Sequence, residues 1–182
     1  MTHKTNFQLV SAMNAAFGNP KGDPANIDWD RIRNQSLNIA DEFGELMVAL
    51  GADETLIKAM VKNLKWAAQK VVNPVDRDKV RDAFGDIHVF GYGGHHLMGI
   101  DADRDMRSIV DGVMTRFIKD EADKAATIAK HAAKGVTEVY FEGEYPTMVM
   151  KSAVDQPDAR KGKFMKSASF SEPVFYDPAE EQ

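Results

Sequence analysis

The sequence contains no cysteine, and this absence excludes several kinds of protein. Without thiolates the chain cannot hold zinc through cysteine, attack a substrate with a cysteine nucleophile or depend on disulfides for stability. Any metal ion must therefore be held by oxygen or imidazole ligands. The 182 residues fit one domain, since domains usually have about 100–200 residues, and the fold must rest on its hydrophobic core.

Long apolar runs and an excess of positive charge are also missing. No stretch approaches the roughly 18 apolar residues that span a bilayer, and the polar start Met1-Thr2-His3-Lys4 lacks the apolar segment of a secretory signal. The chain has 23 basic and 28 acidic residues, which argues against a module that binds duplex nucleic acid through a basic face. We therefore expect a soluble, cytoplasmic protein without a membrane or nucleic-acid partner.

Most of the chain shows helical periodicity, with apolar residues recurring at three- and four-residue spacing. This pattern predicts helices over residues 6–17, 29–50, 54–69, 77–98 and 103–134. Asp53 and Asp76 are the expected N-caps of the third and fourth helices, because a carboxylate accepts hydrogen bonds from the free N–H groups of a first turn. Gly51 and Gly135 are the expected stops of the second and fifth.

After Gly135 the pattern becomes that of extended chain. Residues 136–141 and 145–150 flank a short turn and predict a β-hairpin, and Pro146 favours an edge position for the second strand. We expect the polar residues that follow to form an extended arm. The predicted fold is thus all-α, with a four-helix-bundle-like catalytic core over residues 1–135 and the hairpin and arm of residues 136–182 in the same domain.

Carboxylates recur at helical spacing on the second expected helix. Glu42 and Glu45 share a stripe with Asn38, and Asp41 lies at its margin. Another face of the same helix is apolar and consists of Ile39, Phe43, Leu46, Met47 and Leu50. Alone, such an acidic stripe is most often the solvated face of a helix.

The fourth expected helix carries a second pair of carboxylates. Asp82 and Asp86 lie four residues apart, among apolar residues on nearly every side, which predicts a buried helix. Buried carboxylates need cationic partners, which arginines or a divalent metal ion can provide. We favour the metal because two stripes agree. Gly44 and Gly85, inside the two motifs, are expected to allow the helix backbones to approach closely.

These carboxylates predict a particular chemistry. Glu42, Glu45, Asp82 and Asp86 form an oxygen-rich ligand set that suits Mg²⁺ or Mn²⁺ better than zinc. A hard dication with open coordination positions binds phosphates and makes a water molecule a better nucleophile. We therefore expect a phosphorylated small-molecule substrate. The alternative is a non-enzymatic accessory protein that binds a partner through its helices, with acids that only keep them in solution.

The order of the motifs resembles that of the MazG-like, all-α nucleoside triphosphate pyrophosphohydrolases, whose signature is E-E-x-x-E on one helix and E-x-x-D on a later one. The first motif here reads Asp41-Glu42-Phe43-Gly44-Glu45. The second is similar to a phage branch described as phosphoribosyl-ATP pyrophosphohydrolase-like: Asp82-Ala83-Phe84-Gly85-Asp86, then Gly91-Tyr92-Gly93-Gly94 and Gly99-Ile100-Asp101. The resemblance covers roughly residues 5–120. The tail of that branch is similar to Gly162-Lys163-Phe164-Met165-Lys166 with Pro173.

The chain departs from the family pattern at several positions. Ala83 occupies the glutamate position of the later motif, so that Asp82 is the substitute acid, and Asp41 replaces a glutamate of the first motif. In the segment 112–117, Val113 stands where the family has an amide, whereas Arg116 keeps the cation. These departures concern the ligand set and the contacts to base or sugar.

The resemblance implies hydrolysis between the α and β phosphates of a (deoxy)nucleoside triphosphate, which gives the monophosphate and pyrophosphate. Two or more Mg²⁺ or Mn²⁺ ions would be held by Glu42, Glu45, Asp82 and Asp86. Asp41, Glu42 and Glu45 are the expected catalytic residues, with Asp41 or Glu42 helping to deprotonate the attacking water. The candidates for binding the substrate are Asn38, Lys62, Lys65, Lys70, Arg116, Lys163 and Lys166.

The resemblance also gives expectations about substrate and assembly. Some phage enzymes of this branch, of the MazZ type, favour dGTP, so that dGTP or GTP is the leading candidate substrate, in the host cytoplasm if the chain is phage-encoded. The same chemistry on phosphoribosyl-ATP or another dNTP is the alternative. The family usually forms dimers or tetramers, and we expect a homodimer or homotetramer here.

Overall fold

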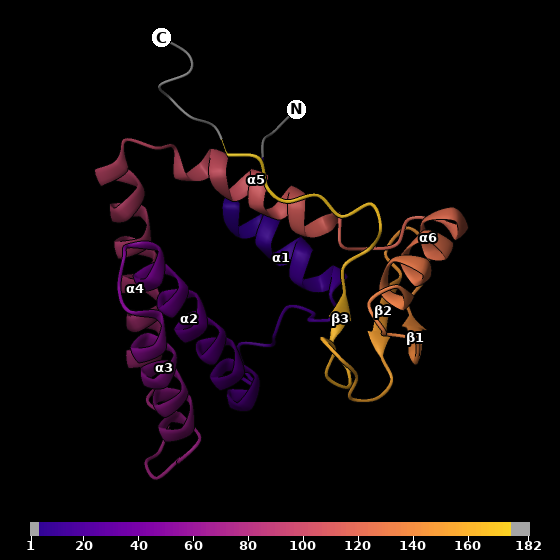
Figure 1. The fold of residues 1–182 in the computed structure, drawn as a ribbon. Coiled ribbons are helices and arrows are strands. Elements are labelled where there is room, and N and C mark those ends of the chain that lie inside the picture. Colours follow the sequence, from indigo (N-terminus) through magenta and orange to yellow (C-terminus); the bar gives the residue numbers. More distant parts are fainter. Residues whose placement is uncertain (1–3, 176–182) are drawn as a thin grey trace. The chain divides into compact units, whose positions relative to one another are not determined.

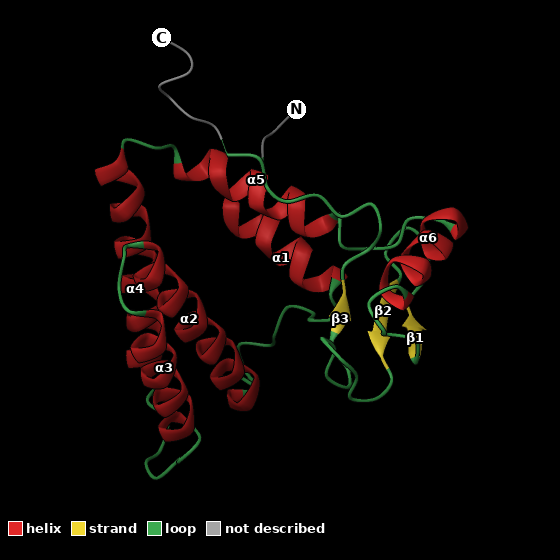
Figure 2. Ribbon diagram, in the orientation of Figure 1, coloured by secondary structure: helices red, strands yellow, loops and turns green. Residues whose placement is uncertain are grey.

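The computed structural model describes residues 4–175, which are mostly helical (Figures 1 and 2). Its helices are α1 Asn6–Ala16, α2 Trp29–Ala49, α3 Glu54–Ala68, α4 Arg77–Met98, α5 Ala102–Met114 and α6 Glu121–Ala132. Strands β1 Val139–Glu142, β2 Val149–Ser152 and β3 Phe164–Met165 form one small antiparallel sheet. The predicted mostly helical class with a β element near the C-terminus is confirmed. No helix in the described range is long and apolar enough to cross a membrane.

The chain divides into two compact units. The first comprises the described parts of Met1–Lys21 and His88–Gln182, and the second is Gly22–Ile87, so that the division falls inside α4. The predicted organisation into residues 1–135 and 136–182 of one domain stays a prediction.

In the second unit, α2 and α3 pack against each other as a helical hairpin (Figure 1). Asp53 caps α3 as predicted, because its side chain accepts a hydrogen bond from the backbone N–H of Leu56 at 2.7 Å. Asp76 likewise accepts from the N–H of Lys79 at 3.1 Å, at the start of α4. Gly51, at φ 93°, follows the end of α2, where a left-handed residue is needed. The local start and stop signals therefore determine where these helices begin and end.

Gly44 is a point of close approach between α2 and α3. It is buried, and a Cβ placed on it would lie 2.8 Å from Cγ2 of Val61 and 3.5 Å from Cγ2 of Ile57. The expected close approach is thus confirmed at Gly44. The same expectation is wrong at Gly85, where an added Cβ would meet nothing within 4 Å, because this face of α4 is open in the described chain.

The two glycines form a matched pair for substitution. We expect Gly44→Ala to destabilise the fold by about 1–3 kcal/mol, since the β-branched side chain of Val61 has little freedom to move away. Gly85→Ala should instead stabilise α4 by up to about 1 kcal/mol, because alanine is the better helix former. Urea unfolding followed by circular dichroism measures both. Equal changes in the free energy of unfolding would contradict the placement of Gly44.

In the first unit, residues 103–134 form two helices, so that the prediction of one long helix is wrong. The connection between α5 and α6 carries Phe117 and Ile118, which are 1% and 0% exposed. The N–H of Ile118 donates to the carbonyl of Met148 at 2.9 Å, and Asp120 then caps α6 through the N–H of Asp123. The apolar pattern continues through this connection, but its side chains are buried by contacts with the sheet instead of along a helix.

The predicted hairpin is present as β1 and β2, with Val139 opposite Ser152, but both strands begin three or four residues later than predicted. The edge position predicted for the second strand is wrong, because β3 pairs with β2 on its other side and makes β2 central. Pro146 lies before β2 and removes no hydrogen bond from it. Tyr145, which precedes Pro146, donates a hydrogen bond to Glu121 on α6 at 2.7 Å. Partial desolvation of the Tyr145 hydroxyl and this hydrogen bond raise its pKa to about 12.

The core of the first unit lies at the sheet. Its buried members are Ile118, Val136, Met150, Ala159 and Met165. The rings of Phe17, Phe117 and Phe164 pack next to one another, with centroids 4.5–5.9 Å apart. Phe17, at the C-terminal end of α1, therefore packs against the sheet.

The predicted extended arm follows β3. The Ser167 hydroxyl donates to the carbonyl of Thr115 at 2.8 Å, and the N–H of Ala168 donates to the Thr127 hydroxyl at 2.8 Å. These bonds hold the arm against α6 and the end of α5. Residues 176–182 of the predicted arm lie outside the described residues.

Helix α4 has the predicted bounds, but the expectation that it is buried is wrong for the single chain. None of its residues is buried, and Phe90 and Leu97 are 77% and 87% exposed. An apolar sequence pattern shows which surface avoids water, but it does not show whether the same chain covers that surface. Most apolar side chains of α4 are left exposed by the described residues of one copy.

Candidate functional site

The carboxylate stripe of α2 lies on the exposed side of the helical hairpin. Asn38, Glu42 and Glu45 are exposed, whereas Gly44 between them faces α3. Within residues 4–175, no cationic side chain pairs with Glu42 or Glu45. Both glutamates are therefore available to a ligand from solution.

The structure brings together two predicted site residues at the contact between α2 and α3. Nζ of Lys65 lies 2.7 Å from Oδ2 of Asp41, and both side chains are partly buried. The ion pair fixes Asp41 at the margin of the acidic stripe. It also neutralises Lys65, which reduces the charge that this lysine can offer to a phosphate.

The carboxylates of α4 are also free of cations. Asp82 and Asp86 are exposed, and neither forms an ion pair with a described residue. Other charged groups on the same turns do pair: Arg81 lies 3.7 Å from Asp78, measured between Nη1 and Oδ1. The alternative in which arginines neutralise the two aspartates is therefore not what the described chain shows.

Among the described residues, the two stripes are not gathered into one site. Glu42, Glu45, Asp82 and Asp86 all belong to the second unit. No group of three or more His, Asp or Glu side chains that could hold a metal ion occurs among the described residues. The predicted ligand set therefore stays a prediction.

Lys62 and Lys70, two of the lysines predicted to bind phosphate, have different surroundings. Lys62 is exposed on α3, in the same unit as the carboxylates. Nζ of Lys70 lies 5.2 Å from the centroid of the Trp66 ring, in a cation–π contact. Of the two, Lys62 has the more open position for a phosphate.

In the first unit, the structure places two predicted phosphate-binding cations over one aromatic ring. The guanidinium of Arg116 lies 5.6 Å, and Nζ of Lys166 4.0 Å, from the centroid of Phe170. Lys166 also pairs with Glu172 at 3.0 Å. Nε of Arg116 is buried without an acceptor in the described chain. The contact of Phe170 with these two cations could not be predicted from the sequence, because no local pattern links Phe170 to Arg116.

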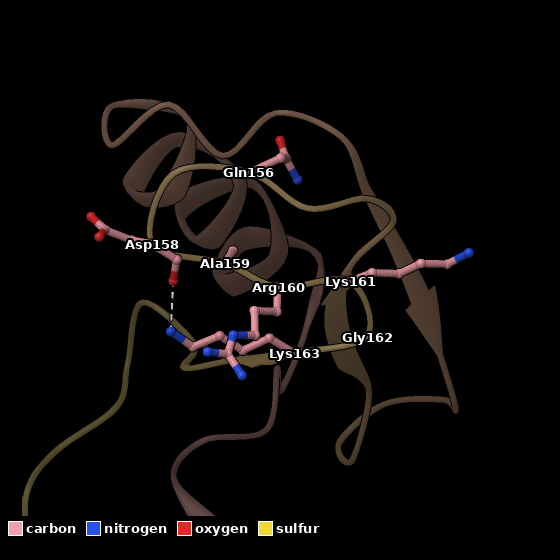
Figure 3. A pocket seen from close by; sticks show the side chains of 7 residues that line it. All are labelled: Gln156, Asp158, Ala159, Arg160, Lys161, Gly162 and Lys163. Atoms are coloured by element: carbon pink, nitrogen blue, oxygen red, sulfur yellow. Dashed lines mark hydrogen bonds between the residues drawn. The ribbon is translucent and has the colours of Figure 1, made fainter. Parts of the chain in front are cut away.

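A hollow of about 680 Å³ opens in the loop between β2 and β3 (Figure 3). It is lined by Gln156, Asp158, Ala159, Arg160, Lys161, Gly162 and Lys163. Of these, only Lys163 was a candidate from the sequence. The run of Arg160, Lys161 and Lys163, three cations within four residues, is the signal that could have pointed to the rest.

No protein-family model, curated protein or solved structure matches the chain. The resemblance to MazG-like enzymes therefore rests on short sequence motifs alone, chiefly those of α2 and α4. A function has to be inferred from the chemistry of these residues and from what surrounds them.

Proposed function

We propose that the protein is a metal-dependent nucleoside triphosphate pyrophosphohydrolase. The observation that carries this proposal is that Glu42, Glu45, Asp82 and Asp86 are exposed and form no ion pair in the described chain, whereas Asp41, Asp76 and Asp78 of the same unit do. Four free carboxylates are hard oxygen donors and fit Mg²⁺ or Mn²⁺. Together they would hold two or more such ions. If these acids only kept the protein in solution, there would be no reason for both motifs to leave two acids free of cations.

The proposed reaction needs a base, a nucleophile and charge neutralisation. A bound dication supplies positive charge for the phosphate oxygens and makes water more acidic. Asp41 or Glu42 takes a proton from water, whose oxygen forms a bond to the α phosphorus as the bond to the bridging oxygen breaks and pyrophosphate leaves. Glu45 completes the acidic stripe, and Asn38, one turn before Glu42, offers an amide donor to the substrate.

Cations are proposed to neutralise the rest of the triphosphate. Lys62 and Lys65 belong to the same unit as the carboxylates, and Lys65 is held in place by Asp41. Arg116, Lys163 and Lys166 of the first unit remain proposed phosphate contacts. The preference for dGTP or GTP is proposed from the resemblance to MazZ-type enzymes.

We also propose that the active form is a homodimer or homotetramer. The α2–α3 hairpin leaves a row of apolar side chains in water, with exposures of 52–72%: Phe43, Leu46, Leu50, Leu56, Met60 and Leu64. They recur at three- or four-residue spacing on both helices, and a large exposed apolar surface marks an interaction site. A second copy of the same hairpin supplies two more helices with matching rows, and four such helices enclose a bundle core. The occupant we propose is therefore a second copy of this chain.

The direct test is hydrolysis by the full chain. Each (d)NTP and phosphoribosyl-ATP is incubated with Mg²⁺ or with EDTA, and chromatography separates monophosphate, diphosphate and pyrophosphate. We expect Mg²⁺-dependent formation of the monophosphate and pyrophosphate, fastest with dGTP. A diphosphate product contradicts cleavage between the α and β phosphates. Absence of cleavage of every nucleotide contradicts the proposal and favours the accessory binding protein.

A further inference from the structure

The hollow between β2 and β3 lies in a loop that is held in one shape. The Gln156 side chain accepts from the N–H groups of Thr137 and Glu138 at 2.9 and 3.0 Å, and it donates to the Ser152 hydroxyl at 2.6 Å. Ala159 is 2% exposed and belongs to the core. A ligand that binds this loop therefore does not have to order it, which lowers the entropic cost of binding.

The hollow carries a surplus of positive charge. Three cations and one carboxylate line it, although the chain as a whole has a net charge of −5. No carboxylate in the described range pairs with Arg160, Lys161 or Lys163. In Figure 3 the carboxylate of Asp158 points away from Arg160 and Lys163. Asp155, a second acid of the same loop, accepts from the backbone N–H of Lys161 at 2.9 Å and pairs with none of the three cations, so that positive charge remains in excess.

Two of the cations are directed to the same side of the loop. Figure 3 shows Arg160 and Lys163 extending together, while Lys161 extends in another direction. Nζ of Lys163 donates to the carbonyl of Asp158 at 2.6 Å, which fixes the ammonium and leaves two of its three donors for a ligand. A guanidinium next to a fixed ammonium offers several N–H donors to one oxyanion, and phosphate oxygens match that geometry.

We propose that this hollow is a phosphate-binding site in which Arg160 and Lys163 hold the phosphate groups of a small-molecule ligand. The ligand is either free pyrophosphate or a nucleoside phosphate, because both present the same oxyanions. A volume of about 680 Å³ lies within the roughly 300–1,000 Å³ of small-molecule sites. Because Lys163 is also a proposed phosphate contact of the hydrolytic reaction, this inference deepens the proposed function and rests on it, but binding of phosphate by Arg160 and Lys163 itself needs no metal ion. Because its cations are exposed, binding weakens as salt is added.

The test is isothermal titration of the full chain with pyrophosphate and, separately, with dGTP, both in EDTA. EDTA removes divalent metal, so that the carboxylates cannot contribute through a metal. We expect saturable binding of both ligands, and Arg160→Gln should weaken it about tenfold, as loss of a charge-assisted hydrogen bond does. Tighter binding of dGTP than of pyrophosphate would mean that the hollow also contacts the nucleoside; equal affinity would mean that it holds phosphate alone. Either result supports the site.

Lys161→Gln is the matched control, because it removes one positive charge from the same loop but from a side chain directed elsewhere. It should leave the affinity within about twofold of the wild type, as expected for a charge screened by solvent. Arg160 makes no hydrogen bond through its side chain in the described chain, so that its substitution should not alter the fold, and thermal unfolding verifies this. Absence of binding overturns the proposal. Equal losses in Arg160→Gln and Lys161→Gln overturn it as well, because they indicate diffuse charge.

Discussion

Glu45→Gln and Asp86→Asn are each expected to lower the rate of pyrophosphate release at least about a hundredfold. Each substitution replaces a hard anionic ligand by a neutral amide of nearly the same shape, and removal of one group that stabilises developing charge commonly costs about 10²–10³ in rate. Both side chains are exposed and unpaired in the described chain, so that the fold should be unchanged. Initial rates measured over a range of Mg²⁺ concentrations test this. We expect partial recovery at high Mg²⁺.

Each variant has a matched control on a paired acid. Glu54 forms an ion pair with Lys58 on α3, and Asp78 lies near Arg81 on the same helix as Asp86. Glu54→Gln removes the same charge outside both stripes, and Asp78→Asn removes it one turn before Asp82, from an acid that already lies near Arg81. Both rates should stay close to that of the wild type. Full activity of Glu45→Gln and Asp86→Asn would show that the stripes are not catalytic. Equal losses in all four variants would indicate an effect of net charge.

The helix bounds could be predicted from the sequence because their determinants are local. Asp53 and Asp76 accept hydrogen bonds from the first turns of α3 and α4, and Gly51 provides the left-handed residue after α2. Such signals act within a few residues, so that they are visible without knowledge of the rest of the chain.

Elements that depend on distant partners could not be predicted in this way. The break between α5 and α6 exists because Ile118 bonds to Met148 and is buried at the sheet, thirty positions away along the chain. The strand β3 has two residues, too few for alternation to be recognised, and exists through its pairing with β2. In both cases a long-range contact outweighs the local preference.

In the candidate site, too, local features could be predicted and long-range ones could not. The spacing of Glu42 and Glu45 placed them correctly on one side of α2, and Gly44 does mark a close helix contact. Whether α4 is covered, and by what, depends on surfaces that periodicity does not identify. The Arg116–Phe170 contact and the shape of the hollow at Arg160 likewise result from tertiary structure.

Placing two charges in the apolar row of α2, as Phe43→Glu with Leu46→Glu, is expected to convert a dimer or tetramer into a monomer. Burial of each side chain in an interface contributes about 1.5–3 kcal/mol, so that loss of both should raise the dissociation constant at least about a hundredfold. In the single chain these side chains are already 59% and 52% exposed, and the helix content should therefore be retained. Light scattering coupled to size exclusion measures the mass, and circular dichroism measures the helix content.

Phe7→Glu is the control, since Phe7 is 69% exposed on α1 and lies outside the hairpin. The Phe7→Glu variant should have the same mass in solution as the wild type. A wild-type protein that is a compact monomer at micromolar concentration would contradict the assembly.

Because the single chain does not gather three acidic ligands among its described residues, the monomeric variant should also bind Mn²⁺ more weakly than the wild type. Unchanged Mn²⁺ affinity in a monomer would show that association covers the apolar row but does not complete the metal site.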